Sequence, residues 1–156
     1  MMYNPFSLIG KTILVTGASS GIGRVTAIEC SKMGAKLILT GRNEERLKET
    51  LALLTGEGHT HLCYDLSNEE EIKELCTTIP AIDGLANCAG ISMLKPILAL
   101  TANNLHELFA TNYYAPVLLT KQLAKAKKLQ HGASLVYVGS ISGISNVATA
   151  LSTYGS

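Results

Sequence analysis

A glycine-rich stretch near the start of the chain has the residue types and spacing to bind a phosphate group. It runs Thr16-Gly17-Ala18-Ser19-Ser20-Gly21-Ile22-Gly23. The apolar, β-branched segment 12–15 before it predicts a buried parallel strand. A helical pattern over 24–33, with Val25 among its apolar positions, follows it and ends at Gly34. Glycines at such a turn let the backbone approach a diphosphate, and the helix N-terminus offers free N–H groups. The stretch predicts a nucleotide site.

The order of the glycines narrows the kind of nucleotide site. The spacing is Gly-x-x-x-Gly-x-Gly, whereas the common dinucleotide fingerprint is Gly-x-Gly-x-x-Gly. The Gly-Lys-Ser/Thr ending of a P-loop is missing, which argues against a nucleoside-triphosphate hydrolase. Taken alone, the stretch is also compatible with a tight turn that only requires small residues.

Composition and charge exclude several other classes of protein. The 156 residues are 47% hydrophobic, which suits one α/β domain. Because the net charge is only +1, we expect no nucleic-acid partner and no membrane partner. The four cysteines form no Cys-x-x-Cys pair, so we expect reduced thiols and a cytoplasmic location. The histidines are scattered; we expect no metal site, and we place His59 and His61 on the surface.

Strand-like and helix-like patterns alternate along the rest of the chain. Further strands are predicted over 36–40, 61–64, 84–87 and 134–138. Helices are predicted over 43–54, after a capping box from Ser67 to Glu70, and over 101–123 with a kink at Pro116. Such alternation implies βαβ crossovers and an α/β, doubly wound parallel sheet, a Rossmann fold with strand order 3-2-1-4-5.

The last predicted strand has the composition of an internal strand. Its residues 135–138, Leu-Val-Tyr-Val, carry no charge, proline or bulge residue that would protect an edge from pairing with another chain. In the order 3-2-1-4-5 this strand would nevertheless form an edge. We therefore expect the sequence to be part of a chain of roughly 250 residues, a common length for one-domain α/β enzymes.

The residues after the second predicted strand indicate which dinucleotide binds. In NAD sites of this architecture an acidic residue about 20 positions past the glycines binds the ribose 2′-hydroxyl. Gly41 occupies that position here, and Arg42 follows it. A guanidinium can bind a 2′-phosphate bidentately, and at a helix start its charge is otherwise unfavourable against the helix dipole. We expect the cofactor to be NADP(H) and residues 1–156 to form one NADP-binding domain that is incomplete.

The glycine order and the later motifs together resemble the short-chain dehydrogenase/reductase family. The motifs are Tyr64-Asp65-Leu66 after the third strand, Asn87-Cys88-Ala89-Gly90 at the end of the fourth, Asn112 in the long helix, and Ser140 and Tyr154 after the fifth. They occur in the family's order and on the elements that the family uses. The chain departs from the family at Cys88, where an asparagine is usual.

The resemblance implies a set of cofactor-binding residues. In the family the glycine loop binds the diphosphate, Asp65 binds the adenine amino group, and the motif from Asn87 to Gly90 stabilises the sheet and passes close to the cofactor. From the residues alone, Asp65 is equally a turn or capping residue. The expected cofactor-binding residues are Gly17, Ser19, Ser20, Gly21, Ile22, Gly23, Arg42, Asp65, Asn87, Ala89 and Gly90.

The resemblance also implies catalytic roles. Asn112 would widen its helix and hold a water of a proton relay, Ser140 would bind the carbonyl oxygen, and Tyr154 would be the acid/base. Ser142 competes with Ser140, because the gap from Ser140 to Tyr154 is one residue longer than usual. Tyr154 would begin a Tyr-x-x-x-Lys motif whose lysine falls at the second position beyond Ser156. The printed chain therefore lacks the ammonium that lowers the pKa of the tyrosine.

The activity implied is an NADP(H)-dependent transfer of hydride between the nicotinamide and a carbonyl or secondary-alcohol substrate, as in the 3-oxoacyl-carrier-protein reductases. The alternative is a non-catalytic dinucleotide-binding module that keeps the fold without the lysine. The resemblance further implies a homodimer or a homotetramer.

Overall fold

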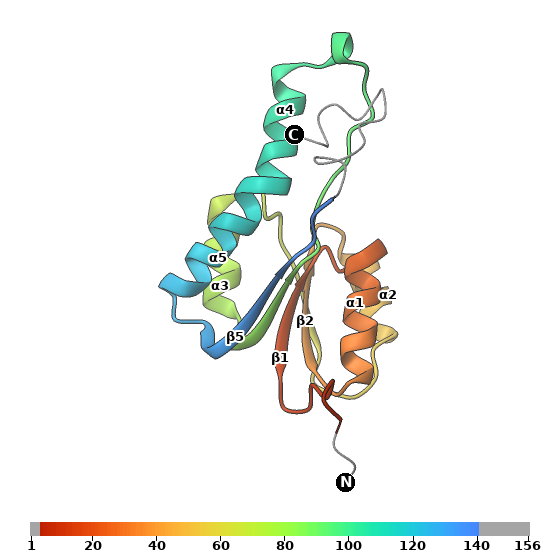
Figure 1. Ribbon diagram of the computed structural model, residues 1–156, viewed down its shortest axis with the longest axis vertical. Coiled ribbons are helices and arrows are strands. Elements are labelled where there is room, and N and C mark those ends of the chain that lie inside the picture. The colour runs from red at the N-terminus through yellow and green to blue at the C-terminus, as the bar shows by residue number, and fades with distance from the viewer. Residues whose placement is uncertain (1–3, 141–156) are drawn as a thin grey trace.

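The computed structural model describes residues 4–140, which form a parallel five-stranded sheet between two layers of helices (Figure 1). The strands pair in the order β3-β2-β1-β4-β5, which confirms the predicted doubly wound α/β fold. The strands are β1 (Thr12–Thr16), β2 (Lys36–Gly41), β3 (Thr60–Cys63), β4 (Ile82–Asn87) and β5 (Leu129–Tyr137).

Helices connect the strands and cover both faces of the sheet. They are α1 (Gly21–Lys32), α2 (Glu44–Ala52), α3 (Glu69–Thr78), the short η1 (Ile97–Ala99), α4 (Ala102–Phe109), the π-helical η2 (Ala110–Tyr114) and α5 (Ala115–Lys125). Helices α1 and α2 lie on one face and α3 and α5 on the other, while α4 extends past the carboxyl end of the sheet (Figure 1). Within residues 4–140 no helix is long and apolar enough to cross a membrane.

The sheet separates two apolar cores, because side chains alternate between its faces along each strand. Leu14 of β1 belongs to the core beneath α3 and α5, which includes Leu119. The next residue, Val15, belongs to the core beneath α1 and α2, with Ala27 and Leu47. Both strand residues are 0% exposed, as expected for a parallel strand that is covered on both faces.

Helix α1 packs on the sheet through small side chains. Its buried residues are Gly23, Ala27 and Ser31, whereas Val25 is 57% exposed. The helix begins at Gly21, earlier than the predicted segment 24–33. Val25, one of the apolar positions of that pattern, therefore lies on the exposed side of the helix. Small residues one turn apart carry little hydrophobic signal, yet they let the helix lie close to the sheet.

The start of α3 differs from the predicted capping box. Asn68, rather than Ser67, is the N-cap, and its Oδ1 accepts a hydrogen bond of 2.9 Å from the Glu70 amide. The Ser67 hydroxyl instead donates to Asp65 Oδ1 at 2.7 Å, and its amide donates to the same oxygen at 2.9 Å. Serine and asparagine are both good caps. The predicted cap was wrong by one position because Asp65 holds Ser67 in a turn.

The predicted helix over 101–123 is continuous through a π-helical turn. Thr101 caps α4 as expected, since its side chain accepts from the amide at the N3 position. In η2 the backbone widens, so that the amide of Ala115 donates to the carbonyl of Ala110, five residues back. Pro116 follows at the start of α5 and has no N–H to continue the helical pattern. The distortion expected at Pro116 is thus a widening immediately before it.

β5 forms one edge of the described sheet and exposes apolar side chains there. Val136 is 56% exposed and Tyr137 is 51% exposed. The Tyr137 hydroxyl shares a hydrogen bond of 2.7 Å with Thr120 of α5, which ties the strand to the helix beside it. That β5 is an internal strand of a longer sheet stays a prediction.

His59 links the amino end of β2 to the loop after α2. Its Nδ1 accepts from the Leu37 amide at 3.0 Å, and its Nε2 therefore donates to the Thr55 carbonyl, also at 3.0 Å. β3 pairs with β2 only from Ile38 onward, so the imidazole takes the place of a strand partner for Leu37. His59 and His61, both expected on the surface, are half-buried.

Replacing His59 by alanine should lower the free energy of unfolding by about 1–2 kcal/mol, because the Leu37 amide would lose its acceptor. Urea unfolding followed by circular dichroism measures the loss. His131→Ala, at an exposed position of β5, is the control and should leave the midpoint unchanged. An unchanged midpoint for His59→Ala would show that the imidazole is not a needed partner.

Candidate functional site

The carboxyl ends of all five strands open into one cleft. Its volume is about 630 Å³, and it is lined by residues that follow each strand: Gly17 after β1, Arg42 after β2, Tyr64 and Asp65 after β3, Cys88 after β4 and Val138 after β5. In open α/β sheets, ligands bind at this edge, where the strand order reverses. Here the reversal lies between β1 and β4.

Most of the site residues predicted from the sequence lie around this cleft. Those that line it are Gly17, Ser19, Ser20, Gly21, Ile22, Arg42, Asp65, Ala89, Gly90, Asn112 and Ser140. Gly23 and Asn87 do not line the cleft and are buried next to it. Tyr154 and its neighbour in the motif, Ser142, lie outside the described residues.

The glycine loop is shaped by close backbone approaches on two sides. A Cβ on Gly17, whose φ is +64°, would lie 2.8 Å from both Cα and N of Ala89. A Cβ on Gly23 would lie 2.4 Å from the carbonyl oxygen of Gly17. Backbone atoms cannot turn aside as a side chain can, so both positions require glycine. These contacts bring α1 onto the loop and the loop onto the end of β4.

The amino end of α1 presents amide groups to the cleft. The N-cap, Ser20, makes no side-chain capping bond, and the first turn contains no acidic residue. The amides of Gly21, Ile22 and Gly23 have no intrahelical acceptor, because they belong to the first turn. The helix dipole adds a partial positive charge at the same place. An anion such as a phosphate is stabilised by this arrangement.

Two polar side chains hold the loop after β4. Thr16 Oγ1 accepts from the amides of Cys88 at 3.1 Å and Ala89 at 3.0 Å. Asn112 binds both polar groups of the Ile91 main chain: its Oδ1 accepts from the amide at 2.8 Å, and its Nδ2 donates to the carbonyl at 2.9 Å. The side chain of Asn112 is thereby committed to the loop. Its main chain, in the widened turn η2, is what remains for other partners.

Arg24 joins the glycine loop to α2, a role that was missed from the sequence. Its guanidinium donates to the Ser19 carbonyl at 2.7 Å and to Thr50 Oγ1 at 3.0 Å, and it pairs with Glu49 at 3.1 Å. The buried Thr50 hydroxyl donates in turn to the Ala18 carbonyl at 2.9 Å. The only local signal was an arginine directly after the last glycine, and two of its partners, Glu49 and Thr50, lie far along the chain.

The wall at the end of β2 has room for a side chain. Gly41 closes the strand, and a Cβ there would lie 3.6 Å from Ser19 Oγ and 3.7 Å from Leu47 Cδ2, which are ordinary contacts. Arg42 follows and lines the cleft, as does Arg46 one turn into α2, which was also missed from the sequence. A carboxylate at this wall would therefore be sterically possible, yet the residues present are a glycine and two arginines.

Burial disfavours the thiolate form of three cysteines, of which Cys88 lines the cleft. Burial raises the pKa of Cys30 and of Cys88, and it raises the pKa of Cys76 to about 11. A thiol with a raised pKa is protonated at neutral pH and is a poor nucleophile. Among the described residues, no group of histidines, cysteines and acids is arranged to hold a metal ion.

The parallel sheet, the glycine loop and the cleft at the switch in strand order define a Rossmann fold. Residues 11–156 match the family model described as short chain dehydrogenase. The chain belongs to the short-chain dehydrogenase/reductase family, which confirms the resemblance seen in the sequence.

Several sequence relatives and solved structures that are similar to this chain are named as reductases. The 3-ketodihydrosphingosine reductase of Mus musculus is 33% identical over 89% of this chain and 45% of its own length. The 3-oxoacyl-[acyl-carrier-protein] reductase FabG of Rickettsia felis is 32% identical over 88% of this chain and 57% of its own. The structure of Pseudomonas aeruginosa RhlG in an active-site complex with NADP matches with a TM-score of 0.88 at 26% identity, over 99% of this chain and 64% of that one. The chain spans about half the length of the curated relatives it matches.

Replacing Gly23 by alanine should destabilise the fold by about 2–3 kcal/mol, because the new methyl group would meet main-chain atoms of Gly17 and Thr16 that cannot move aside. Chemical unfolding gives the difference in free energy. Gly139→Ala is the matched control, since nothing lies within 4 Å of a Cβ built there. Equal stabilities for the two variants would mean that the loop is not held by this contact.

Proposed function

We propose that the protein is an NADP(H)-dependent oxidoreductase that transfers a hydride between the nicotinamide and a small carbonyl or secondary-alcohol substrate. The observation that supports this best is the composition of one cleft. The glycine loop and the amino end of α1 lie at one part of it, and Asn112 and Ser140 line another. The same cleft thus combines a diphosphate site with polar groups suited to a reacting carbonyl.

The residues of the cleft fit a dinucleotide. The amides of Gly21 and Ile22 would bind the diphosphate, and small residues after β4 would let the cofactor lie against the backbone. Asp65 would accept from the adenine amino group. Gly41 stands where an NAD site has its acid, and Arg42 would bind a 2′-phosphate, which supports NADP(H). When bound, the cofactor supplies or accepts the hydride.

The reaction also needs a proton and a group that stabilises charge on the substrate oxygen. Ser140 would donate a hydrogen bond to that oxygen as negative charge develops, and Tyr154 would exchange the proton. The Asn112 side chain fixes the loop at Ile91, and the Asn112 main chain would hold a water of the proton relay. Ser142 remains the competitor of Ser140.

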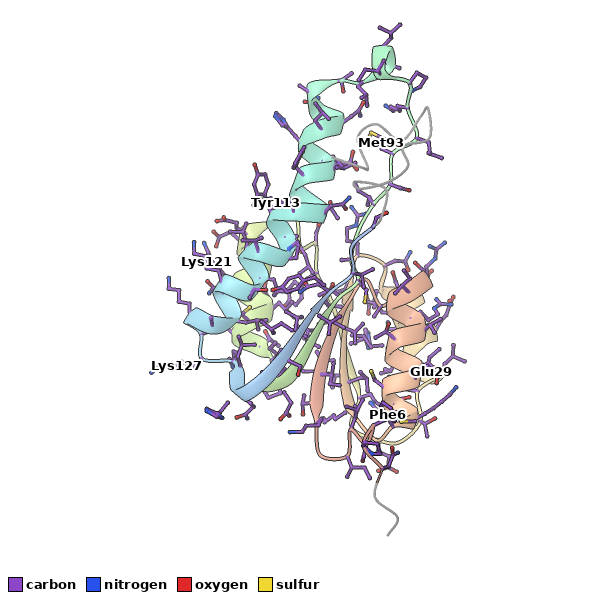
Figure 2. All side chains as sticks on the ribbon, viewed as in Figure 1. Phe6, Glu29, Met93, Tyr113, Lys121 and Lys127 are labelled. Atoms are coloured by element: carbon purple, nitrogen blue, oxygen red, sulfur yellow. The ribbon has the colours of Figure 1, made fainter. Side chains whose placement is uncertain are left out.

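We propose a homodimer or homotetramer that uses the long helix. Tyr113 is 58% exposed and Val117, four residues later, is 50% exposed. The helix therefore leaves apolar surface uncovered. Figure 2 shows Tyr113 and Lys121 on the side of this helix that is turned away from the sheet. The four free cysteines support a reducing, cytoplasmic location for this assembly.

Gly41→Asp should change the coenzyme preference from NADPH to NADH, because the carboxylate would repel a 2′-phosphate and accept from a 2′-hydroxyl. Isothermal titration with both coenzymes measures this, and the unmodified protein should bind NADPH at least about tenfold more tightly. Arg42→Asp should act in the same direction. Ser7→Asp, at an exposed position of the opposite sheet end, adds the same charge as a control. An unmodified protein without preference for NADPH would refute the cofactor assignment.

In the full-length protein, Ser140→Ala should lower kcat by about 10²–10³-fold, because the developing oxyanion would lose a donor. Turnover is followed by the absorbance of NADPH with a panel of ketones, and Ser142→Ala should keep most of the rate. The opposite result would assign the role to Ser142. Tight coenzyme binding without turnover of any carbonyl would favour the non-catalytic module.

A further inference from the structure

The first turn of α2 carries a second cation toward the cleft. Arg42 precedes the N-cap, Asn43, and Arg46 lies four residues after Arg42. Both arginines line the cleft. No ion pair joins either of them to another residue within the described chain, which contains six such pairs elsewhere. Two full positive charges therefore line the cleft without a salt-bridge partner among the described residues. The carboxylate that lines the cleft with them, Asp65, accepts hydrogen bonds from Ser67.

The acidic residues of α2 are paired with other cations. Glu44 binds Lys48 at 2.7 Å, and this contact holds the pKa of Glu44 below its usual value. Glu49 binds Arg24 at 3.1 Å. Neither carboxylate lines the cleft, and neither does Glu45. The charges around the start of α2 are thus separated: none of these three acids lines the cleft, whereas Arg42 and Arg46 do.

The main chain of Arg46 is fixed with respect to the glycine loop. Its amide donates to Asn43 Oδ1 at 2.9 Å, and its carbonyl shares the Thr50 hydroxyl at 3.0 Å. The Arg24 guanidinium reaches the same carbonyl at 3.5 Å while it donates to Ser19 of the loop at 2.7 Å. Only the exposed side chain of Arg46 is free to adjust. The Arg46 side chain therefore extends from a main-chain position that is fixed next to the expected diphosphate site.

We propose that Arg46 acts together with Arg42 to bind the 2′-phosphate of NADP(H), so that Arg46 is a specificity-determining residue of the coenzyme site. This inference rests on the proposed function. A phosphate monoester carries a charge of about −1.5 to −2 at neutral pH and three acceptor oxygens. One guanidinium binds two of these oxygens bidentately. The remaining negative charge and the third oxygen can be bound by a second guanidinium. Two arginines on one wall match both requirements.

The test uses two probes that differ only by the 2′-phosphate: adenosine 2′,5′-bisphosphate and adenosine 5′-monophosphate. In isothermal titrations, Arg46→Gln should raise the Kd of the bisphosphate about five- to tenfold and leave that of the monophosphate unchanged. Arg46→Lys, which keeps the charge without the fork, should lose less. The difference between Arg46→Gln and the unmodified protein should shrink in high salt.

Lys32→Gln removes the same charge from α1 and is the matched control. Lys32 pairs with Glu29 at 2.7 Å, and Figure 2 shows Glu29 on the outer side of α1, toward the opposite end of the sheet. This variant should leave both affinities unchanged.

Three results would overturn the inference, and they are distinguishable. Equal weakening of both probes by Arg46→Gln would mean that Arg46 only supports the helix. An unchanged bisphosphate affinity, with a clear loss in Arg42→Gln, would leave the coenzyme proposal standing and remove Arg46 from it. Equal binding of the two probes by the unmodified protein would refute the NADP(H) assignment itself.

Discussion

The contact on which the site depends is one between main chains. Gly23 of α1 lies against the carbonyl of Gly17, and Gly17 lies against Ala89 after β4, at distances that leave no room for a Cβ. Because of these two approaches, the first helix, the loop and the end of the fourth strand form one layer of backbone. The amides of the first turn of α1 then face the cleft, and Thr16 secures the other side by accepting two amides from the β4 loop. Glycine is needed at both positions because it has no Cβ to separate the main chains.

Around this layer, polar side chains are used mainly to hold backbone. Asn112 binds the main chain of Ile91, Arg24 binds the carbonyl of Ser19, and Thr50 binds that of Ala18. The bonds of Asn112 and Thr50 join segments that are distant in sequence, so the walls of the cleft are fixed before a ligand arrives. Pre-organisation of this kind reduces the entropy that binding must overcome. The groups left to meet a ligand are amides, arginines and a few hydroxyls.

The sequence was sufficient to predict the strand order and most of the cleft, because strand and helix patterns alternate and chemistry-bearing residues follow each strand. It was insufficient where packing depends on small residues, as at Ala27 and Ser31, which contribute little to a hydrophobic pattern. It also failed at α3, where Asp65 decides between two adjacent caps. Arg24 and Arg46 were missed because their partners or their exposure to the cleft arise only in three dimensions. Tyr154 stays a prediction.

The widened turn η2 decides which side chains of α5 face the core relative to those of α4. A regular α-helix advances about 100° per residue, so the extra residue of a π-turn rotates everything after it by that angle relative to an unbroken helix. Leu119 and Leu123 reach the core because of this phase shift, while Asn112 still faces the β4 loop. A regular α-helix over the same residues would therefore turn one half away from its neighbour. The wide turn lets both halves keep their partners with this number of residues between them.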